Sequence, residues 1–508
     1  MFDVVVVGSG YGGSTVAARL SERFRVLLVE KGRRWRPEDL PAGILGLVRS
    51  YRTERAHPDG LWAMRFGKGT GNAQVSALGG ASLVNYGITM RPADHVLASW
   101  PLPAGELNTA FAKALAVLAP LPAPVADFLG DKAFLDLVEP GRRIDIENTI
   151  DWSRCDYCGT CVPGCRRGAK RSLDMTYLAA AETNGAEVRP ETEVMDFTPL
   201  PSGGYEIVLA RTGRPSESEL VRTRTLVLAA GTFGTLDLLN RTRLRIPVSP
   251  LFGKRMSMNG DAFAFLYNTS HPLSGHHGAP ITTSVRLLAD GPEGRPLTLT
   301  VMSGRVPAAI ARFSAMLLAI AGGVLGHRVN ANGSDLISRR ARRRIKDLFG
   351  VKEGGALSQS FMYKLTGEDQ GQGEARFVGG RAVLDWPGYA HDPIHTFAAR
   401  RLEEWAARIG GTVITDPGTW PGGRSFGVHP LGGCRIGRTY EDGVVDDLCR
   451  VFRPDGGCYP GLRIVGAPVL PSAPGVPPSL TITAIAERAA EDMERELSCE
   501  LVSSCAEA

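Results

Sequence analysis

The stretch that decides the fold is Asp3–Glu30, DVVVVGSGYGGSTVAARLSERFRVLLVE. Its first segment, Asp3–Val7, is a run of valines after one aspartate, as expected for a central parallel strand covered on both faces. A glycine-rich turn follows at once, then a helical segment at Ser14–Arg23 and a second apolar strand at Arg25–Val29. This order of strand, turn, helix and strand predicts a βαβ unit that binds a dinucleotide.

The turn has the spacing GxGxxG, with Gly8, Gly10 and Gly13 in the key positions and Tyr11 and Gly12 between them. The first glycine permits the tight turn, the second lets the backbone approach a pyrophosphate, and the third lets helix and strand pack closely. The amides that begin the helix are expected to hold the phosphates.

An acidic residue, Glu30, ends the second strand about 20 residues after the loop, where a carboxylate can bind ribose hydroxyls. Lys31 follows it and is also placed at the nucleotide. The loop alone does not distinguish FAD from NAD, but its N-terminal position and the sequence EKGRRW at 30–35 favour FAD.

Composition fits an enzyme of two lobes. The chain has 508 residues, of which 43% are apolar and 22% charged, and its formal net charge is +5. The mild positive charge suits an anionic cofactor and does not indicate nucleic acid. The first apolar run lacks a charged leader and a cleavage site, and the nine cysteines do not suggest a secreted disulfide framework. We therefore expect a cytoplasmic enzyme with mostly reduced cysteines.

Later segments predict an α/β fold whose nucleotide lobe is discontinuous. A buried strand is expected at Thr225–Gly231, a last strand at Arg463–Val465 and a closing helix at Ser479–Arg488. These assign 1–250 and 425–508 to a Rossmann-like FAD-binding lobe, with part of 100–150 on the substrate side. Residues 251–424 are expected to form a substrate-binding lobe with strands such as Leu297–Met302.

Several motifs, taken in order, resemble the glucose–methanol–choline (GMC) oxidoreductases, and among them the bacterial cholesterol-oxidase-like branch. The resemblance spans most of the chain and implies an FAD-binding fold, an α+β substrate lobe built on an antiparallel sheet, and oxidation of an alcohol. The motifs are GSGYGGS at 8–14, EKGRRW at 30–35, GGASLVNYG at 79–87, AAGTFGT at 229–235, NGD at 259–261, HPLGGC at 429–434, VDD at 445–447 and GVPPSLTITAIAER at 475–488.

The resemblance also implies cofactor contacts beyond the first loop. One group is expected against the flavin and pyrophosphate, another at adenine and ribose, and the rest near the end of the chain. They are Gly79, Gly80, Ser82 and Asn85; Val194, Ala230 and Gly231; and Gly466, Pro478, Ser479 and Leu480.

His429 is the expected base, because imidazole is readily tuned to accept a proton near neutral pH and the resembling enzymes place this histidine at the substrate oxygen. The helix from Ser479 is expected to direct its positive end at the charge that the reduced cofactor acquires. The family pattern breaks at Pro477, where the resembling enzymes usually carry asparagine or histidine. Asn259 is our expected substitute, and His391 and His395 are further candidates.

Four cysteines, Cys155, Cys158, Cys161 and Cys165, have the C-x2-C-x2-C-x3-C spacing of a bacterial ferredoxin cluster, and four thiolates also suit zinc. In the resembling branch such a turn serves packing near the flavin, so our expectation is that no metal binds, with a metal site as the alternative.

Two other segments stand out. The apolar stretch at 313–325 is too short to span a membrane and is expected to be a buried core helix, with a membrane-contacting or substrate-admitting surface as the alternative. The basic run at 339–346 is expected to be a solvated helix face.

The sequence thus predicts FAD-dependent oxidation of a bulky sterol-like or secondary-metabolite alcohol, with oxygen or another electron acceptor, no nucleic acid partner and no spanning membrane segment. Two alternatives remain: oxidation of a polar sugar or aminosugar hydroxyl, and a flavoprotein that acts as an isomerase, reductase or cyclase because of Pro477.

Overall fold

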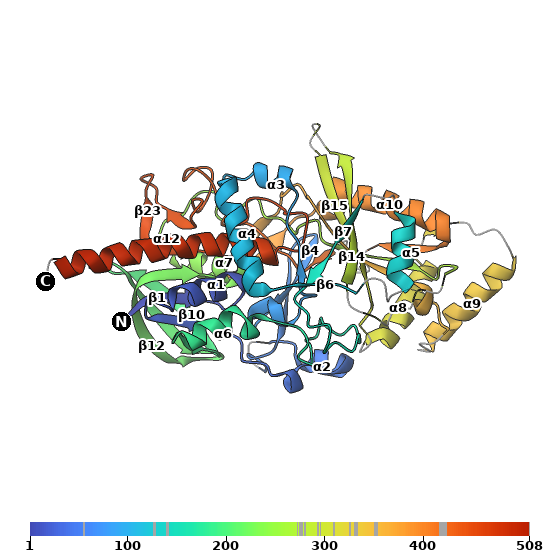
Figure 1. Ribbon diagram of the computed structural model, residues 1–508, viewed down its shortest axis with the longest axis horizontal. Coiled ribbons are helices and arrows are strands. Elements are labelled where there is room, and N and C mark those ends of the chain that lie inside the picture. The colour runs from blue at the N-terminus through green and yellow to red at the C-terminus, as the bar shows by residue number, and fades with distance from the viewer. Residues whose placement is uncertain are drawn as a thin grey trace.

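The computed structural model describes residues 1–53, 56–124, 129–138, 142–271, 273, 278, 281–291, 294, 296–307, 310–324, 327–329, 334–349, 354–415 and 424–506. The chain forms an elongated molecule with a sheet toward each end, and both termini lie at the end that carries the first sheet (Figure 1). It is a mixed α/β fold, as predicted.

The first sheet is built around the N-terminal strand. Parallel pairing joins β23, β12, β1, β2 and β9, while β10 and β11 extend the sheet in antiparallel fashion from the long strand β12, and β22 pairs with β23. The bounds are β1 Phe2–Val7, β2 Val26–Val29, β9 Glu187–Arg189, β10 Thr192–Pro199, β11 Tyr205–Arg211, β12 Arg214–Leu228, β22 Arg450–Phe452 and β23 Cys458–Ile464.

Helices cover this sheet and bring distant parts of the chain together. Helix α1 packs against α12 and α6, and α12 also packs against α4. Glu487 connects α12 to the two other helices, because it accepts hydrogen bonds from Arg19 of α1 at 2.8 Å and from Tyr177 of α6. The bounds are α1 Tyr11–Leu20, α3 Asp94–Ala98, α4 Ala104–Leu118, α6 Tyr177–Thr183, α7 Gly231–Thr242 and α12 Ser479–Ala506.

The second sheet is antiparallel throughout, with the strand order β16-β20-β13-β17-β15-β14-β7. Its members come mainly from the middle of the chain, but β7 comes from the segment before residue 150. The bounds are β7 Arg143–Asp145, β13 Ala262–Tyr267, β14 Ile281–Asp290, β15 Pro296–Gly304, β16 His327–Val329, β17 Phe361–Gly367 and β20 Gly411–Thr415.

The two faces of this sheet differ because successive side chains of a strand point to opposite sides. Phe361, Tyr363 and Leu365 of β17 belong to a core with Phe134 of α5 and Trp405 of α10. On the opposite face, Met362 belongs to a core with helix α8. Lys364 has the same parity as Met362, which directs it away from α10. The bounds of these helices are α5 Leu129–Leu137, α8 Ala311–Val324, α9 Ser334–Leu348 and α10 Pro393–Ile409.

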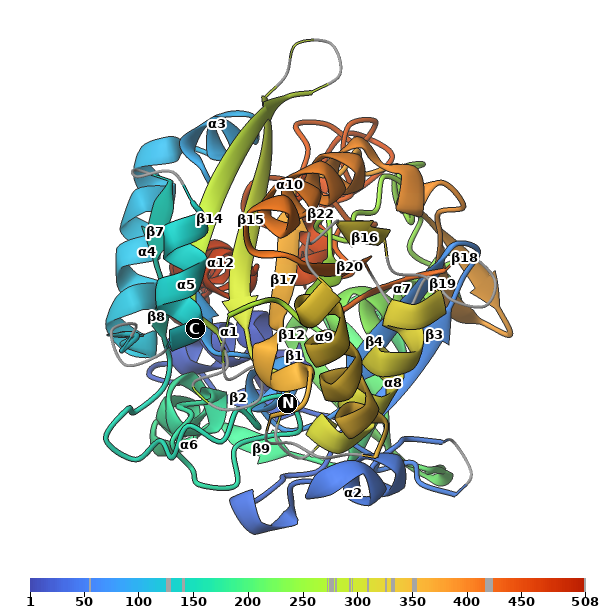
Figure 2. The same ribbon diagram turned by 90° about the vertical axis from the view of Figure 1, so that its right-hand side faces the viewer.

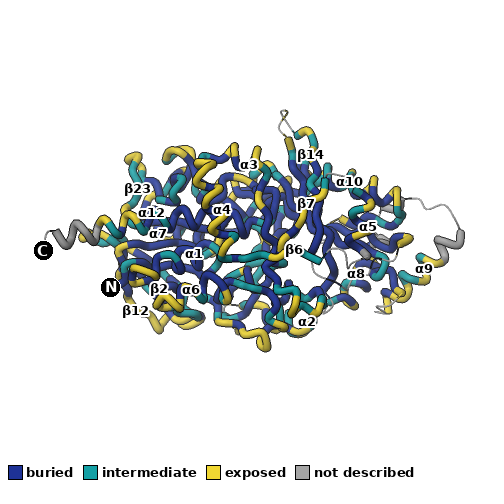
Figure 3. Tube along the Cα trace, in the orientation of Figure 1, coloured by how far each residue is buried: buried dark blue, intermediate teal, exposed yellow. Residues whose placement is uncertain are grey.

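Smaller elements lie between the two sheets. Strand β21 pairs with β4 in a three-stranded sheet, and the hairpin β18–β19 packs against α7 (Figure 2). The bounds are α2 Gly43–Arg49, β3 Trp62–Phe66, β4 Thr70–Val75, β5 Ile88–Thr89, β6 Leu121–Pro122, β8 Glu147–Asn148, β18 Glu374–Val378, β19 Arg381–Asp385 and β21 Ser425–Gly427. Buried residues occupy the interior of both sheets, and exposed residues lie mainly on the outer helices and loops (Figure 3).

Candidate active site

A cavity of about 1020 Å³ runs from the glycine loop after β1 to the face of the second sheet. Its wall includes Gly10 of the first sheet's loop, Phe263 and Lys364 of the second sheet, and His429 of the loop after β21. Ordinary ligand pockets have volumes of about 300–1,000 Å³. The cavity is therefore at the upper end of this range, as expected for a site that binds a large cofactor.

Three helices begin at this cavity. Tyr11, Gly231 and Ser479 are the first residues of α1, α7 and α12, and all three line the wall. The free amides and dipole of a helix N-terminus favour negative charge. Three such termini at one cavity suit a ligand that carries a pyrophosphate and that becomes more negative on reduction.

The glycine loop fits a phosphate-bearing cofactor. A Cβ on Gly8 would lie 2.5 Å from Ala229 O, and one on Gly13 would lie 1.9 Å from Gly8 O, so both positions are closed by the protein's own backbone. A Cβ on Gly10 would meet no protein atom within 4 Å, although Gly10 lines the cavity. The backbone at Gly10 is therefore open to a ligand.

Glu30 fits the ribose end of a dinucleotide. Its carboxylate accepts hydrogen bonds from Ser9 N at 3.0 Å, Ser9 Oγ at 2.7 Å and Gly32 N at 2.8 Å, and the residue lines the cavity. Burial raises the pKa of Glu30, although these bonds oppose the shift. Lys31 also lines the cavity and forms an ion pair with Glu193 at 2.6 Å.

Most of the expected cofactor residues lie on the cavity wall. They are Gly8, Gly10, Tyr11, Gly12, Glu30, Lys31, Gly80, Asn85, Val194, Ala230, Gly231, Gly466, Pro478 and Ser479.

Four expected residues lie behind the wall instead: Gly13, Gly79, Ser82 and Leu480. Ser82 holds the loop in shape, since its Oγ donates to Gly79 O at 2.7 Å and accepts from Leu173 N at 3.1 Å. Leu480 is in the hydrophobic core beneath α12. These residues support the cavity without facing it.

Tyr11 meets Asn85 of the loop at 79–87, where Asn85 Nδ2 donates to Tyr11 Oη at 2.8 Å. Burial raises the pKa of Tyr11 to about 12, so its phenol stays neutral at physiological pH. This pair fixes a polar edge on an otherwise apolar part of the wall.

The side chains of His429, Asp261 and Lys364 form one connected group. Asp261 Oδ1 lies 2.8 Å from His429 Nδ1 and 2.7 Å from Lys364 Nζ, while Oδ2 accepts from Val428 N at 2.8 Å and His429 N at 3.0 Å. Burial alone would raise the pKa of Asp261, but the charges and hydrogen bonds of His429 and Lys364 outweigh it and lower the pKa to about 2. Asp261 is therefore a carboxylate.

The charge of Asp261 determines the tautomer of His429. A carboxylate only accepts hydrogen bonds, so His429 Nδ1 must carry the proton that it shares with Asp261. The other ring nitrogen, Nε2, then has a free lone pair. Because His429 lines the cavity and its ring is held on the Nδ1 edge, Nε2 is the nitrogen available to accept a proton from a ligand.

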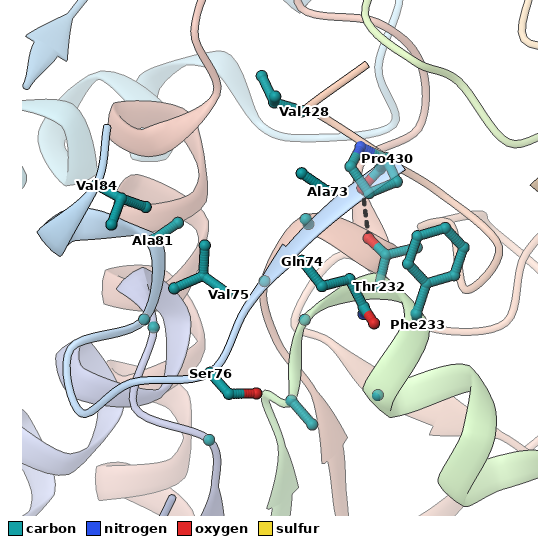
Figure 4. A pocket seen from close by; sticks show the side chains of 18 of the residues that line it. Ala73, Gln74, Val75, Ser76, Ala81, Val84, Thr232, Phe233, Val428 and Pro430 are labelled. Atoms are coloured by element: carbon teal, nitrogen blue, oxygen red, sulfur yellow. Dashed lines mark hydrogen bonds between the residues drawn. The ribbon is translucent and has the colours of Figure 1, made fainter. Parts of the chain in front are cut away.

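Backbone pairing brings these distant residues together. Ser257 and Leu431 exchange two hydrogen bonds, at 3.1 and 2.9 Å, and so align the loop before β13 with the loop that contains His429. Thr232 of α7 donates to Pro430 O at 2.6 Å, which fixes the second loop from the other side (Figure 4). Phe263 and Lys364 face each other across β13 and β17, with Nζ 4.6 Å from the ring centroid.

Asn259 lies elsewhere than we expected. Its Nδ2 donates to Val476 O at 2.9 Å and its Oδ1 accepts from Gly475 N at 3.0 Å, so the amide holds the loop before α12. Asn259 is fully buried and is not part of the cavity wall. Its amide is therefore already used and is not presented to a ligand.

The two other histidine candidates also lie away from the cavity. His395 is buried beside the ring of Tyr389, and burial lowers its pKa to about 4. His391 is exposed at the end of the turn Tyr389–His391. Pro477, in contrast, does line the cavity. Lys364 of the second sheet also lines the cavity, although its Nζ is buried.

The structure thus includes two site residues that sequence reasoning missed. Asp261 belongs to the NGD motif, but nothing local shows which histidine it contacts. Lys364 interrupts the strand sequence FMYKLTG, and a lysine within a buried strand is the signal that could have found it, because buried lysines require a partner.

The cysteine turn packs near the cavity. Cys161 is buried, Cys155, Cys158 and Cys165 are partly buried, and none forms a disulfide. Lys170 Nζ donates to Asn85 O at 2.9 Å and Cys161 O at 3.2 Å, which joins the turn to the loop at 79–87. Among the residues that the structure describes, no three His, Cys, Asp or Glu side chains are grouped to hold a metal ion.

The remainder of the wall is mostly apolar. The close view shows Ala73 and Val75 on strand β4 with Val84 to their left, Phe233 to the right and Val428 above (Figure 4). Leu47 and Val48 of α2 complete one end, whereas the described residues of α8 contribute nothing to the wall.

The two-lobed fold and this cavity define a class of protein, the nucleotide-dependent oxidoreductases with a separate substrate sheet. Residues 3–256 and 422–486 match the family descriptions of GMC oxidoreductase for its N- and C-terminal parts. The chain belongs to the GMC oxidoreductase family. FAD is its cofactor, and it is an oxidoreductase that acts on CH–OH donors.

Curated relatives have related activities at modest identity. The chain is 29% identical to the cholesterol oxidase of Mycobacterium tuberculosis H37Rv, over 96% of this chain and 90% of that protein. It is 27% identical to the cholesterol oxidase of Acinetobacter baumannii, over 96% and 93% of the two chains. It is 26% identical to the long-chain-alcohol oxidase FAO4B of Arabidopsis thaliana, over 95% and 66%.

Solved structures share the fold. Pyridoxine 4-oxidase from Mesorbium loti superposes with a TM-score of 0.58 at 17% identity, covering 97% of this chain and 99% of that one. A fungal aryl-alcohol oxidase gives a TM-score of 0.53 at 14% identity, with the same coverage. Among the described residues, no helix has the length and apolar character needed to cross a membrane.

Proposed function

We propose that the protein oxidises a bulky, largely apolar alcohol, of the sterol or secondary-metabolite type, to the corresponding carbonyl compound. The observation that carries the proposal is the orientation of His429 by the buried carboxylate Asp261 within a large, mostly apolar cavity. The cholesterol oxidases and long-chain-alcohol oxidase among the relatives support the same substrate class.

In this proposal His429 Nε2 accepts the hydroxyl proton of the alcohol while the carbinol hydrogen leaves with its electron pair. FAD, when bound, supplies the acceptor for that hydride. Asp261 accepts from Nδ1 and stabilises the imidazolium that forms. Asp261 does not take the proton itself, because its pKa is about 2.

Lys364 supplies the second polar contact that Pro477 lacks. Lys364 lines the cavity, and its buried ammonium is held by the same oxygen of Asp261 that binds His429. A buried positive charge behind the cavity wall stabilises the negative charge that develops on the substrate oxygen as the proton leaves. We therefore assign this role to Lys364, and not to Asn259.

Anaerobic mixing tests the proposal, because reduction of bound FAD removes its visible absorbance without any added acceptor. A sterol, a long-chain alcohol and a sugar are compared as donors. The sterol-like or long-chain alcohol should bleach the wild-type enzyme, and His429→Gln should slow bleaching by about 10²–10⁴-fold while FAD remains bound. Faster bleaching by the sugar would favour the polar-substrate alternative.

Bleaching by none of the three would contradict alcohol oxidation and favour an isomerase, reductase or cyclase. Among the residues that the structure describes, one observation favours alcohol oxidation over that alternative. The base that an oxidation needs is present and oriented by Asp261, although the usual polar residue at 477 is not.

A further inference from the structure

Helix α8 has apolar side chains on two opposite faces. Ala311, Ala315 and Ala319 are buried against the second sheet, as part of a separate core with Phe265 and Ile414. On the other face, four large apolar side chains follow the spacing i, i+3, i+4, i+7 that places residues on one side of a helix. They are Phe313, Met316, Leu317 and Ile320, with exposed fractions of 44%, 36%, 39% and 46%.

The expectation of a buried core helix at 313–325 therefore holds for only one face of α8. Its buried face agrees with a core helix, but its outer face is open to solvent and requires another explanation. A contiguous exposed apolar surface marks an interaction site.

Helix α9 lies against α8 and is fixed to the body of the protein. Arg344 Nε donates to Ala319 O at 2.7 Å, which joins the two helices. Asp347 Oδ2 accepts from Tyr267 Oη and Leu357 N, both at 2.8 Å, so this carboxylate is buried and already bound. The α8–α9 pair is thus held on the body of the protein.

The outer surface of the pair is basic as well as apolar. Arg312, Arg339, Arg342 and Lys346 are exposed. Next to them are three exposed apolar side chains, and no carboxylate is exposed among those residues of α8 and α9 whose burial the structure describes. The three exposed apolar side chains are Ile345, Leu348 and Phe349, with exposed fractions of 53%, 42% and 82%.

We propose that α8 and α9 dock the protein on the surface of an anionic phospholipid bilayer. Apolar side chains of such a surface enter the boundary between headgroups and acyl chains, while lysine and arginine bind anionic headgroups. Charge decides between the possible occupants. A second copy of this chain would bring the same basic side chains to the same surface, whereas an anionic bilayer is complementary to both features.

The docking surface is also related to the cavity. Ile44, Leu45 and Val48 of α2 are exposed, with fractions of 39%, 69% and 67%, and Val48 also lines the cavity. In both ribbon views α2 and α8 lie on the lower side of the molecule (Figures 1 and 2). A docked protein would therefore present the α2 end of the cavity toward the bilayer, where an apolar alcohol dissolves. This last step rests on the proposed function.

Flotation of the purified holoenzyme with lipid vesicles tests the docking surface. Vesicles of phosphatidylcholine alone are compared with vesicles that also contain phosphatidylglycerol. We expect the protein to float with the anionic vesicles and to be released by salt. The triple variant Arg339→Glu/Arg342→Glu/Lys346→Glu should weaken this binding by roughly a hundredfold or more, at about 1 kcal/mol for each basic residue near the surface.

An apolar variant, Met316→Ser/Ile320→Ser, tests the other component and should weaken binding at every salt concentration. Leu244→Ser and Arg243→Glu are matched controls, because both residues are exposed on the nucleotide-binding side of the molecule, and they should float like the wild type. Bleaching of the flavin by a detergent-dispersed alcohol should be unchanged in all four variants.

Three results would overturn the docking proposal. They are wild-type protein that does not float with anionic vesicles, binding that survives both sets of substitutions, and a lipid-independent dimer that the same substitutions dissociate. Failure of the proposed function looks different: no alcohol bleaches the flavin, yet vesicle binding still follows the α8 and α9 substitutions.

Discussion

Asp261 fixes both neighbours on which the proposed chemistry depends, and its removal should therefore affect both. Asn at this position keeps the size but places an amide NH2 where either Lys364 or the amides of Val428 and His429 need an acceptor. We expect Asp261→Asn to lower the rate of flavin bleaching by about 10²-fold or more. Stopped-flow absorbance measures this rate, and bound FAD is counted in the same sample. A rate within threefold of the wild type would contradict the positioning role.

If positions 364 and 477 act on the same substrate oxygen, a polar side chain at 477 should partly replace the lysine at 364. We expect Lys364→Met to slow bleaching about 10-fold to 100-fold, since an electrostatic contact to a developing charge is lost. Pro477→Asn alone should change little, but in the Lys364→Met background it should recover part of the rate. Lys364→Arg is the matched control that keeps the charge. If Lys364→Met and Lys364→Met/Pro477→Asn bleach at the same rate, the two positions do not act on the same substrate oxygen.

At this scale the sequence could identify His429 but not its partners. The histidine stands in a recognisable motif, whereas its contacts with Asp261 and Lys364 depend on the register between β13 and β17 and on the pairing of Ser257 with Leu431. Such long-range pairing is decided by tertiary packing, which no local spacing encodes. The same limit explains why Asn259 was assigned to the substrate when its amide in fact holds Gly475 and Val476.

Among the elements, the β1–α1 turn contains one glycine that should matter for FAD binding, Gly10, and one that should matter for stability, Gly13. Gly10→Ala adds a methyl group to open cavity space, so the protein should fold with an unchanged apoprotein melting temperature but retain FAD more weakly. Gly13→Ala sets a Cβ against Gly8 O, and overpacking of this kind costs roughly 3 kcal/mol. Melting curves and FAD titration together distinguish the two effects. Loss of stability in Gly10→Ala would show that the position is closed.

The loop before β13 should make stability depend on pH through Asp369. This carboxyl accepts from Ser257 Oγ at 3.0 Å and from Met258 N and Gly260 N at 2.9 Å. Burial raises its pKa to about 7, and the negative charge of Asp392 adds to this shift, whereas the hydrogen bonds oppose it. Between about pH 4 and 7 the unfolded chain has then lost this proton while the folded one keeps it, so its contribution to stability declines as pH rises. Asp369→Asn should show a smaller decline in melting temperature over that range than the wild type. An equal decline would assign the effect to other groups.

Element boundaries show where pattern reasoning fails. Helix α1 begins at Tyr11 and not at Ser14, because Gly10 already occupies the N-cap position. Helix α12 continues to Ala506, well past Arg488, since the following residues contain no glycine or proline. Its extension is held on the sheet by the buried Arg463 of β23, which donates to Asp492 at 2.8 Å. The buried arginine and its partner lie far enough apart in sequence that neither predicts the other.

For the whole molecule, the two lobes should be coupled through the cofactor. Discontinuity was predictable, because the motifs of one lobe occur at both ends of the chain, and the lobe boundaries at 250 and 425 remain our proposal. The cavity joins three helix N-termini on one side to the loop of His429 and the sheet of Lys364 on the other. A ligand in this position contacts residues that only the complete fold brings together, so it binds the folded state alone.

This coupling predicts that FAD raises the melting temperature of the entire chain in one transition. At a free FAD concentration 100 times its dissociation constant, the folded state should gain about 2.7 kcal/mol. Differential scanning calorimetry of apoprotein over a series of FAD concentrations measures the shift. Gly10→Ala should need more FAD for the same shift, whereas Leu244→Ser, on the outer surface, should follow the wild type. Two separate transitions, of which only one moves with FAD, would show that the substrate sheet unfolds independently and that the cavity does not couple the lobes.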